Sequence, residues 1–203
     1  AVVPVAREFF NLKPEQLNLI IGDGRYYLNI CAKRYDTVIL DAFIGDSCPG
    51  HLMTREAFAS IARVLEPEGT LVINTFGNFE SGKDFFTASL WKTLKAVFPS
   101  VRIHSSSRGN TLYVASARTN LAEVHEPDFE RVHPACVWEV KSAFDSLREP
   151  HPAHGMVLTD DYNPVEFYDA VNRQNHRKYL ALAMRERAEA NAGDETQILL
   201  GRK

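Results

Sequence analysis

The fold is predicted first from residues 17–43, LNLIIGDGRYYLNICAKRYDTVILDAF. Residues 17–21 are a short apolar run that ends at Gly22-Asp23-Gly24, which is typical of a strand buried on both faces and followed by a tight turn. Residues 25–33 suit a short helix, and residues 37–41 are a second run rich in β-branched side chains. We therefore expect two parallel strands of one sheet joined through a helix.

The alternation of strands and helices continues to residue 117. Residues 54–65 are amphipathic with Thr54 as the expected N-cap, and residues 70–76 and 83–98 have strand and helix patterns. Two further strand-like runs, residues 101–106 and 111–117, are separated by a turn short enough only for an antiparallel hairpin. These patterns predict a three-layer α/β fold with a mostly parallel sheet that closes on a C-terminal antiparallel hairpin.

The composition and the positions of prolines suggest how the chain is divided into domains. The 203 residues are 45% hydrophobic and 24% charged, which suits one globular domain with an appendage. Beyond residue 118 the alternation stops, prolines divide the chain, and only residues 137–147 and a charged stretch at 165–190 have helical patterns. We expect an α/β domain over residues 1–118 and a helical C-terminal appendage over residues 119–203.

Charge and cysteine usage exclude several classes of function. The formal net charge is −3, so neither nucleic acid nor an anionic membrane is an expected partner. No apolar run is long enough to span a membrane. Cys31, Cys48 and Cys136 form no CxxC pair, which argues against a disulfide framework and a structural zinc site. A reducing, cytoplasmic location and a small-molecule partner fit these features.

Two aspartates follow the first two predicted strands, at the sheet edge where α/β proteins bind ligands. Beside Asp23, Gly22 and Gly24 permit close backbone approach, and its carboxylate can accept a hydrogen bond from an exocyclic amine. The alternative is an ordinary turn. Asp41 begins a loop, residues 41–52, about twice as long as most connections of this kind. A carboxylate there can orient a cationic amine or accept its proton; the alternative is a helix cap, a role for which Thr54 is better placed.

Four ordered segments resemble successive motifs of spermidine synthase-like proteins: residues 22–25, 35–41, 49–58 and 65–74. The resemblance covers about residues 1–117. It implies a Rossmann-like fold of the class I methyltransferase type and transfer of an aminopropyl group from decarboxylated S-adenosylmethionine to an amine such as putrescine.

The same resemblance implies where the ligands bind. It places the cofactor at Gly22, Asp23, Gly24, Asp41 and Ala42 and the first catalytic acid at Asp41, and Asp46 is the candidate for the second catalytic acid. No metal is implied, because a sulfonium is already an activated leaving group.

Two departures from the family pattern qualify these expectations. The family has a Gly-rich strand and turn, and a second strand ending in an acid, before the helix at which this sequence begins. We therefore expect the chain to be incomplete or to complete its sheet by exchange with another chain. The family also carries two aspartates three residues apart in this loop, and the first of them corresponds to Asp41. Here the second corresponds to Ile44, and Asp46 substitutes for it only if the loop bulges.

The C-terminal region offers two more candidate sites. Residues 158–164, LTDDYNP, resemble a C-terminal motif of bacterial spermidine synthase-like proteins. They either supply acids to an amine site or form a turn that leads into a helix. His151 and His154 superficially resemble a metal-binding pair, but a proline separates them and no acidic ligand has a suitable spacing, so no metal is expected.

Three functions remain open. The first is an aminopropyltransferase-like enzyme with Asp41 acting on the amine and Asp23 holding adenine. The second has the same fold with S-adenosylmethionine as donor, which makes the protein a methyltransferase. The third is a non-catalytic module of this fold that assembles with other chains, as a homo-oligomer for example.

Overall fold

The computed structural model describes residues 2–43, 48–105, 110–121 and 127–167, together with residues 170, 173–174, 177–186 and 188. The chain divides into two units, Ala1–Cys31 and Ala32–Lys203. The residues on both sides of the predicted boundary at 118 belong to the second unit, and that boundary stays a prediction. In the described residues, no helix is both long enough and apolar enough to cross a membrane.

The first unit contains two short helices and a 3₁₀ turn: α1 (Val2–Phe9), η1 (Pro14–Gln16) and α2 (Gly24–Ile30). Helix α1 ends at Phe9, and Asn11, two residues further on, has a φ of 53°, the left-handed conformation that commonly follows a helix end. The amide of Leu12 then donates to the carbonyl of Ala6, 3.1 Å away. Helix α2 begins at Asp23, whose Oδ1 accepts a 2.8 Å hydrogen bond from the amide of Tyr26.

The predicted strand over residues 17–21 is not present. These residues form no regular element, and Ile21 is 85% exposed. A strand requires a neighbour for its backbone groups, and no strand among the described residues pairs with this run. The apolar pattern is therefore not sufficient for a strand here.

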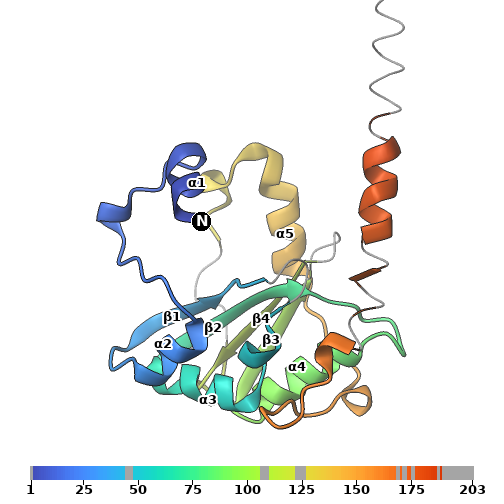
Figure 1. Ribbon diagram of the computed structural model, residues 1–203. Helices are drawn as coiled ribbons and strands as arrows, with labels where there is room; N and C mark the ends of the chain where they lie inside the picture. Colours follow the sequence, from blue (N-terminus) through green and yellow to red (C-terminus); the bar gives the residue numbers. More distant parts are fainter. Residues whose placement is uncertain are drawn as a thin grey trace, which may run out of the picture. The chain divides into compact units, whose positions relative to one another are not determined.

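The second unit is built around a four-stranded sheet with the order β1-β2-β4-β3 (Figure 1). Its strands are β1 (Tyr35–Leu40), β2 (Leu65–Phe76), β3 (Ser100–Ser105) and β4 (Asn110–Ser116). Strands β1 and β2 are parallel, whereas β4 lies antiparallel between β2 and β3. The sheet is thus mixed rather than mostly parallel, because residues 17–21 contribute no strand and β4 inserts beside β2.

Strand β2 begins five residues before the predicted start, at Leu65. Tyr35 pairs with Leu65 and Thr37 with Thr70, so the intervening residues of β2 form an irregularity in the parallel pair. Gly69 lies in this irregularity. A Cβ atom there would be 3.0 Å from the backbone oxygens of Tyr35 and Glu66, closer than most such contacts, so the bulge favours glycine.

Three α-helices of the second unit cover the two faces of the sheet. Helices α3 (Arg55–Val64) and α4 (Phe85–Lys95) lie on one face and α5 (Val137–Asp145) on the other (Figure 1). Short 3₁₀ turns occupy Gly50–Leu52, Phe129–Arg131, Pro134–Cys136 and Pro152–His154. The face under α3 and α4 is the tightly packed one, and its fully buried side chains include Phe58, Leu71, Ile73, Leu90 and Tyr113.

Candidate functional site

The carboxyl ends of β1 and β2 meet at one edge of the sheet, because the two strands are parallel. Leu40, the last residue of β1, pairs with Ile73. The next residues along the two strands, Asp41 and Asn74, are joined by a 3.0 Å hydrogen bond from Asn74 Nδ2 to Asp41 Oδ1. This pair gives the edge an oriented carboxylate that is open to solvent.

The side chain of Asn74 was not singled out from the sequence, although a signal was present. In β2 the residues facing α3 and α4 are Leu71, Ile73 and Thr75, which are all buried. Asn74 has the opposite orientation, since successive side chains alternate between the faces of a strand. An amide near the carboxyl end of a strand, following a strand that ends at a predicted acid, is therefore the pattern that could have identified it.

The loop that follows Asp41 is fastened to the end of β2. The rings of Phe43 and Phe76 have centroids 5.7 Å apart with an interplanar angle of 50°. Further on, Cys48 Sγ donates to Thr75 Oγ1 at 3.0 Å, and this contact is buried. Asp46, the second predicted catalytic acid, lies outside the described residues, as does Ile44.

The cofactor residues predicted in the first unit lie at the start of α2. Asp23 caps the helix through Oδ1, and Gly24 is the first helical residue. A Cβ atom at either Gly22 or Gly24 would meet nothing within 4 Å, so the backbone here is open to the approach of another molecule. Ala42, the remaining predicted cofactor residue, follows Asp41 in the second unit and is partly exposed.

Residues 158–164 lie at the start of α3. Thr54 Oγ1 donates a 2.6 Å hydrogen bond to Asp160 Oδ1 and also caps α3 by accepting from the amide of Ala57, which confirms the predicted cap. Asp160 and Asp161 are both exposed. The two acids differ in that Asp160 is the one bonded to Thr54.

Glu56 is the acid at this helix start whose ionisation is perturbed. Partial burial opposes the charged form, but hydrogen bonds from its own amide, from the amide of Asp160 and from the side chain of Arg55 favour it. Together they hold the pKa of Glu56 below its ordinary value. Glu56 is therefore a charged partner of this junction at neutral pH.

The two histidines of the C-terminal segment have structural partners. His154 Nδ1 lies 2.9 Å from Oδ1 of Asp84, a buried residue that precedes α4. The rings of His151 and His154 are stacked, with centroids 4.7 Å apart. Within the part of the chain that is described, no group of three His, Cys, Asp or Glu side chains has the geometry of a metal site.

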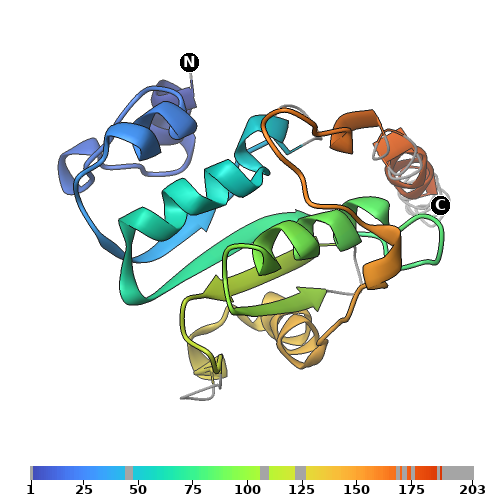
Figure 2. The same ribbon diagram turned by 90° about the horizontal axis from the view of Figure 1, so that it is seen from below.

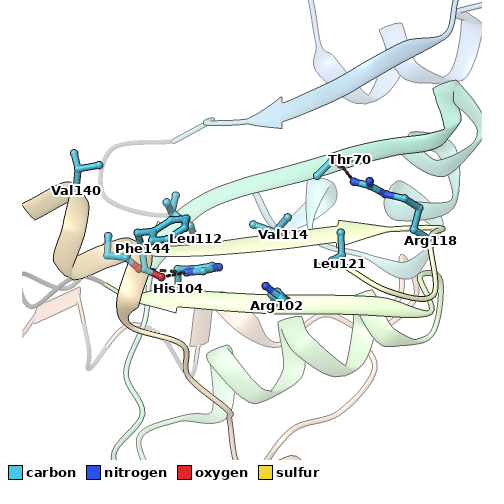
Figure 3. A pocket seen from close by; sticks show the side chains of 10 residues that line it. Thr70, Arg102, His104, Leu112, Val114, Arg118, Leu121, Val140 and Phe144 are labelled. Carbon is cyan, nitrogen blue, oxygen red and sulfur yellow. Dashed lines mark hydrogen bonds between the residues drawn. The ribbon is translucent and has the colours of Figure 1, made fainter. Parts of the chain in front are cut away.

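A separate hollow of about 480 Å³ lies on the face of the sheet beneath α5 (Figure 3). Leu112, which pairs with Asn74, and Val114 form its floor, and Phe144 lies at one end. Two guanidinium groups, Arg102 and Arg118, line it together with His104, and none of the lining residues is a carboxylate. A polycation is repelled by this arrangement, so the hollow does not suit an amine substrate.

Comparison with known proteins decides the family. Residues 2–107, more than half of the chain, match the model of the spermine/spermidine synthase domain. The chain belongs to the spermine/spermidine synthase family. The resemblance inferred from the four sequence motifs is thereby confirmed.

Curated relatives of this spermine/spermidine synthase chain carry related names. It is 27% identical over 187 residues to a probable polyamine aminopropyl transferase of Bifidobacterium longum, an alignment that covers 81% of this chain and 41% of the relative. It is 37% identical over 79 residues to a polyamine aminopropyltransferase of Vibrio vulnificus, covering 37% of this chain and 26% of the relative. The chain thus spans less than half the length of these relatives.

Solved structures agree on the fold. A probable spermidine synthase from Corynebacterium glutamicum matches with a TM-score of 0.54 and 19% identity, over 75% of this chain and 55% of that one. A spermidine synthase in complex with the transition-state analogue AdoDATO matches with a TM-score of 0.55 and 18% identity, over 73% and 55%. These likenesses confirm the predicted Rossmann-like α/β class.

Proposed function

We propose that this chain is part of an aminopropyltransferase, which moves an aminopropyl group from decarboxylated S-adenosylmethionine to an amine such as putrescine. The observation that carries the proposal is the Asp41 carboxylate, held by Asn74 at the carboxyl edge of parallel strands β1 and β2. Membership of the spermine/spermidine synthase family and the names of the curated relatives support it.

The reaction is a displacement at carbon. The lone pair of the acceptor nitrogen attacks the aminopropyl carbon bonded to the sulfonium, and a C–N bond forms as the C–S bond breaks. The bonding electrons pass to sulfur, which leaves as the neutral thioether methylthioadenosine. A cationic amine first loses a proton to expose this lone pair, and its nitrogen becomes positively charged again as the C–N bond forms. No metal is needed, because the sulfonium is already an activated leaving group, and catalysis comes from orientation and proton transfer.

Asp41 suits the acceptor side of this reaction. Its carboxylate attracts a cationic amine, orients the nitrogen and can receive the proton that the nitrogen loses. Asn74 fixes one carboxylate oxygen, so the direction of the other is restricted. Asp46, five residues further along the chain, is the second acid that we assign to the amine.

The donor side of the proposal uses Gly22, Asp23, Gly24 and Ala42. The open backbone at both glycines suits the approach of a nucleoside. We assign to Asp23 the exocyclic amine of adenine, as a contact additional to its capping bond with Tyr26.

Calorimetry and product analysis on the whole protein test this function. We expect decarboxylated S-adenosylmethionine to bind more tightly than S-adenosylmethionine, and putrescine or spermidine to receive an aminopropyl group. Asp41→Asn should lower kcat/KM by about 10²- to 10⁴-fold, the usual contribution of a positioned acid or base. Asp36→Asn, an exposed acid at the other end of β1, is the matched control. An unchanged rate with Asp41→Asn would remove Asp41 from the mechanism.

One observation favours a second function, methyl transfer from S-adenosylmethionine. Ile44 stands where the family has its second aspartate, and one carboxylate fewer weakens the attraction for a polyamine. The same calorimetry separates the two, since a methyltransferase should prefer S-adenosylmethionine. Binding of neither donor would favour a non-catalytic module.

A further inference from the structure

Residues 152–166, which we call the C-terminal strap, run along α4 and then across the start of α3. In Figure 2 the orange strap leaves the green helix α4 and reaches the cyan residues that precede α3. The backbone of the strap is fastened to side chains of α4. Lys92 Nζ donates to the carbonyl of Gly155 at 2.7 Å, and Thr93 Oγ1 accepts from the amide of Leu158 at 2.9 Å. Leu158 is fully buried.

The fit of the strap to α4 is close at Gly155. A Cβ atom on this residue would lie 2.4 Å from the backbone carbon of Ala88 and 2.5 Å from the backbone nitrogen of Ser89. No side chain fits at that distance without movement of the backbone. The strap therefore lies directly on the surface of α4 and has a fixed path.

At the start of α3 the strap and the helix exchange hydrogen bonds in both directions. The amide of Arg55 donates to the carbonyl of Leu158 at 2.9 Å. Thr54 Oγ1 donates to Asp160 Oδ1 at 2.6 Å, and the amide of Asp160 donates to Glu56 Oε2 at 3.0 Å. Hydrogen bonds to a carboxylate are shorter and stronger than those to a neutral acceptor. Both the side chain and the backbone amide of Asp160 are therefore bonded to the start of α3.

Beyond Asp160 the strap contacts the loop that connects Asp41 to α3. Asn163 Nδ2 donates to the carbonyl of Gly50 at 2.8 Å, and Asn163 Oδ1 accepts from the amide of Val165 at 3.2 Å. Both ends of the amide are therefore used. Gly50 begins the 3₁₀ turn Gly50–Leu52, and Leu52 is buried.

Residues 48–54 connect the strap to β2, the strand that carries Asn74. Residues 48–54 are held by the strap at Gly50 and Thr54. At its other end this segment is held by the bond from Cys48 to Thr75, the residue next to Asn74 in β2. The segment is therefore fixed between the strap and the strand that orients Asp41.

We propose that Asp160 and Asn163 are positioning residues that hold residues 48–54 against the carboxyl end of β2, the strand that carries Asn74, and that they set the affinity for the acceptor amine without contacting it. This proposal rests on the proposed function. In this proposal residues 158–164, LTDDYNP, position another segment of the chain and do not supply acids to the amine site. Both acids of the motif are exposed, and the one that is bonded to the start of α3 is Asp160.

Asp160→Ala and Asn163→Asp are the test variants. Asn163→Asp keeps the oxygen that accepts from Val165 and removes the nitrogen that donates to Gly50, so it isolates the contact with the loop. Asp161→Ala is the matched control, because it removes a neighbouring acid that is exposed.

The first readout is amide hydrogen exchange of residues 48–56 in the whole protein without substrate. We expect exchange to accelerate by about tenfold or more in both test variants, since loss of a tie lowers the free energy of local opening. Asp161→Ala should leave exchange unchanged. Unchanged exchange in Asp160→Ala and Asn163→Asp would overturn the proposal.

The second readout is steady-state kinetics with the acceptor amine and the donor varied separately. We expect KM for the amine to rise about tenfold while KM for the donor stays constant, because small displacements in a site weaken the interactions that orient the substrate. A merely structural role would lower the amount of folded enzyme, and hence kcat, at constant KM. A rise in the amine KM with Asp161→Ala and unchanged exchange throughout would indicate that the motif binds the amine directly.

The two readouts separate this proposal from the proposed function. If the wild-type protein transfers no aminopropyl group, the proposed function fails, and the exchange experiment still decides whether Asp160 and Asn163 hold the loop. If transfer occurs and exchange does not respond, the positioning role alone fails.

Discussion

The side-chain amide of Asn74 donates a 3.0 Å hydrogen bond to Oδ1 of Asp41 and joins the ends of two parallel strands across 33 residues of sequence. An exposed carboxylate without such a partner samples several rotamers. The bond restricts Asp41 to a narrower range of directions, which is what a group that must align an amine for attack requires.

We predict that Asn74→Leu lowers kcat/KM for the acceptor amine by about 10- to 100-fold, because Asp41 loses its orientation while its charge remains. Steady-state kinetics on the whole protein measure this. Asn110→Leu makes the same change at an exposed position at the start of β4 and should have little effect. Equal rates for Asn74→Leu and the wild type would show that the bond is irrelevant to catalysis.

The core beneath α4 gives a prediction on stability. Tyr113 is fully buried, and its hydroxyl donates to the carbonyl of Thr87 at 3.2 Å. Burial raises the pKa of Tyr113 far above its ordinary value. Tyr113→Phe keeps the ring and removes the hydrogen bond, so we expect the free energy of unfolding to fall by about 1 kcal/mol. Urea denaturation measures it, with the exposed Tyr162→Phe as control. A loss no larger than that of the control would contradict this assignment.

The close approach of the strap to α4 gives a second prediction on stability. Gly155→Ala places a methyl group within van der Waals overlap of the backbone of Ala88, and we expect a loss of about 1–3 kcal/mol, the usual cost of overpacking. Gly50→Ala is the control, since its added Cβ would meet its neighbours at an ordinary 3.5 Å. Both changes are compared by urea denaturation. Equal stabilities would mean that the strap does not lie on α4 as described.

Features set by neighbouring residues were predictable from the sequence. Thr54 was predicted to cap α3, and it does, because capping involves residues three positions apart. Membership of the spermine/spermidine synthase family was also predictable, since it is recognised from four short segments in order along the sequence. Short stretches of sequence were sufficient for both predictions.

Features that depend on distant partners were not predictable. Residues 17–21 have the pattern of a buried strand but form none, because a strand requires a neighbour that a local pattern does not reveal. The place of β4 between β2 and β3 is likewise a property of the whole sheet. The bond between Thr54 and Asp160 joins residues 106 positions apart, so the sequence left the role of LTDDYNP open between two alternatives.

The junction of the strap and α3 gives a prediction on pH dependence. The pKa of Glu56 is lowered in the folded protein, chiefly by hydrogen bonds that outweigh the opposing effect of burial. A group whose pKa is lower in the folded state stabilises the fold above its ordinary pKa, and this contribution is lost as pH falls through the lowered value. Glu56→Gln removes the charge, so we expect the variant to be less stable than the wild type at pH 7 and the difference to shrink in acid.

Urea denaturation of both proteins between pH 7 and about pH 3, a range that spans ordinary carboxyl pKa values, measures this difference. Glu68→Gln removes an exposed carboxylate in β2 and is the control. The hydrogen bond from the amide of Asp160 should weaken in parallel, so exchange at that amide should accelerate in acid beyond the intrinsic pH effect. A stability difference that stays constant down to the lowest pH would show that the charge of Glu56 does not stabilise the junction.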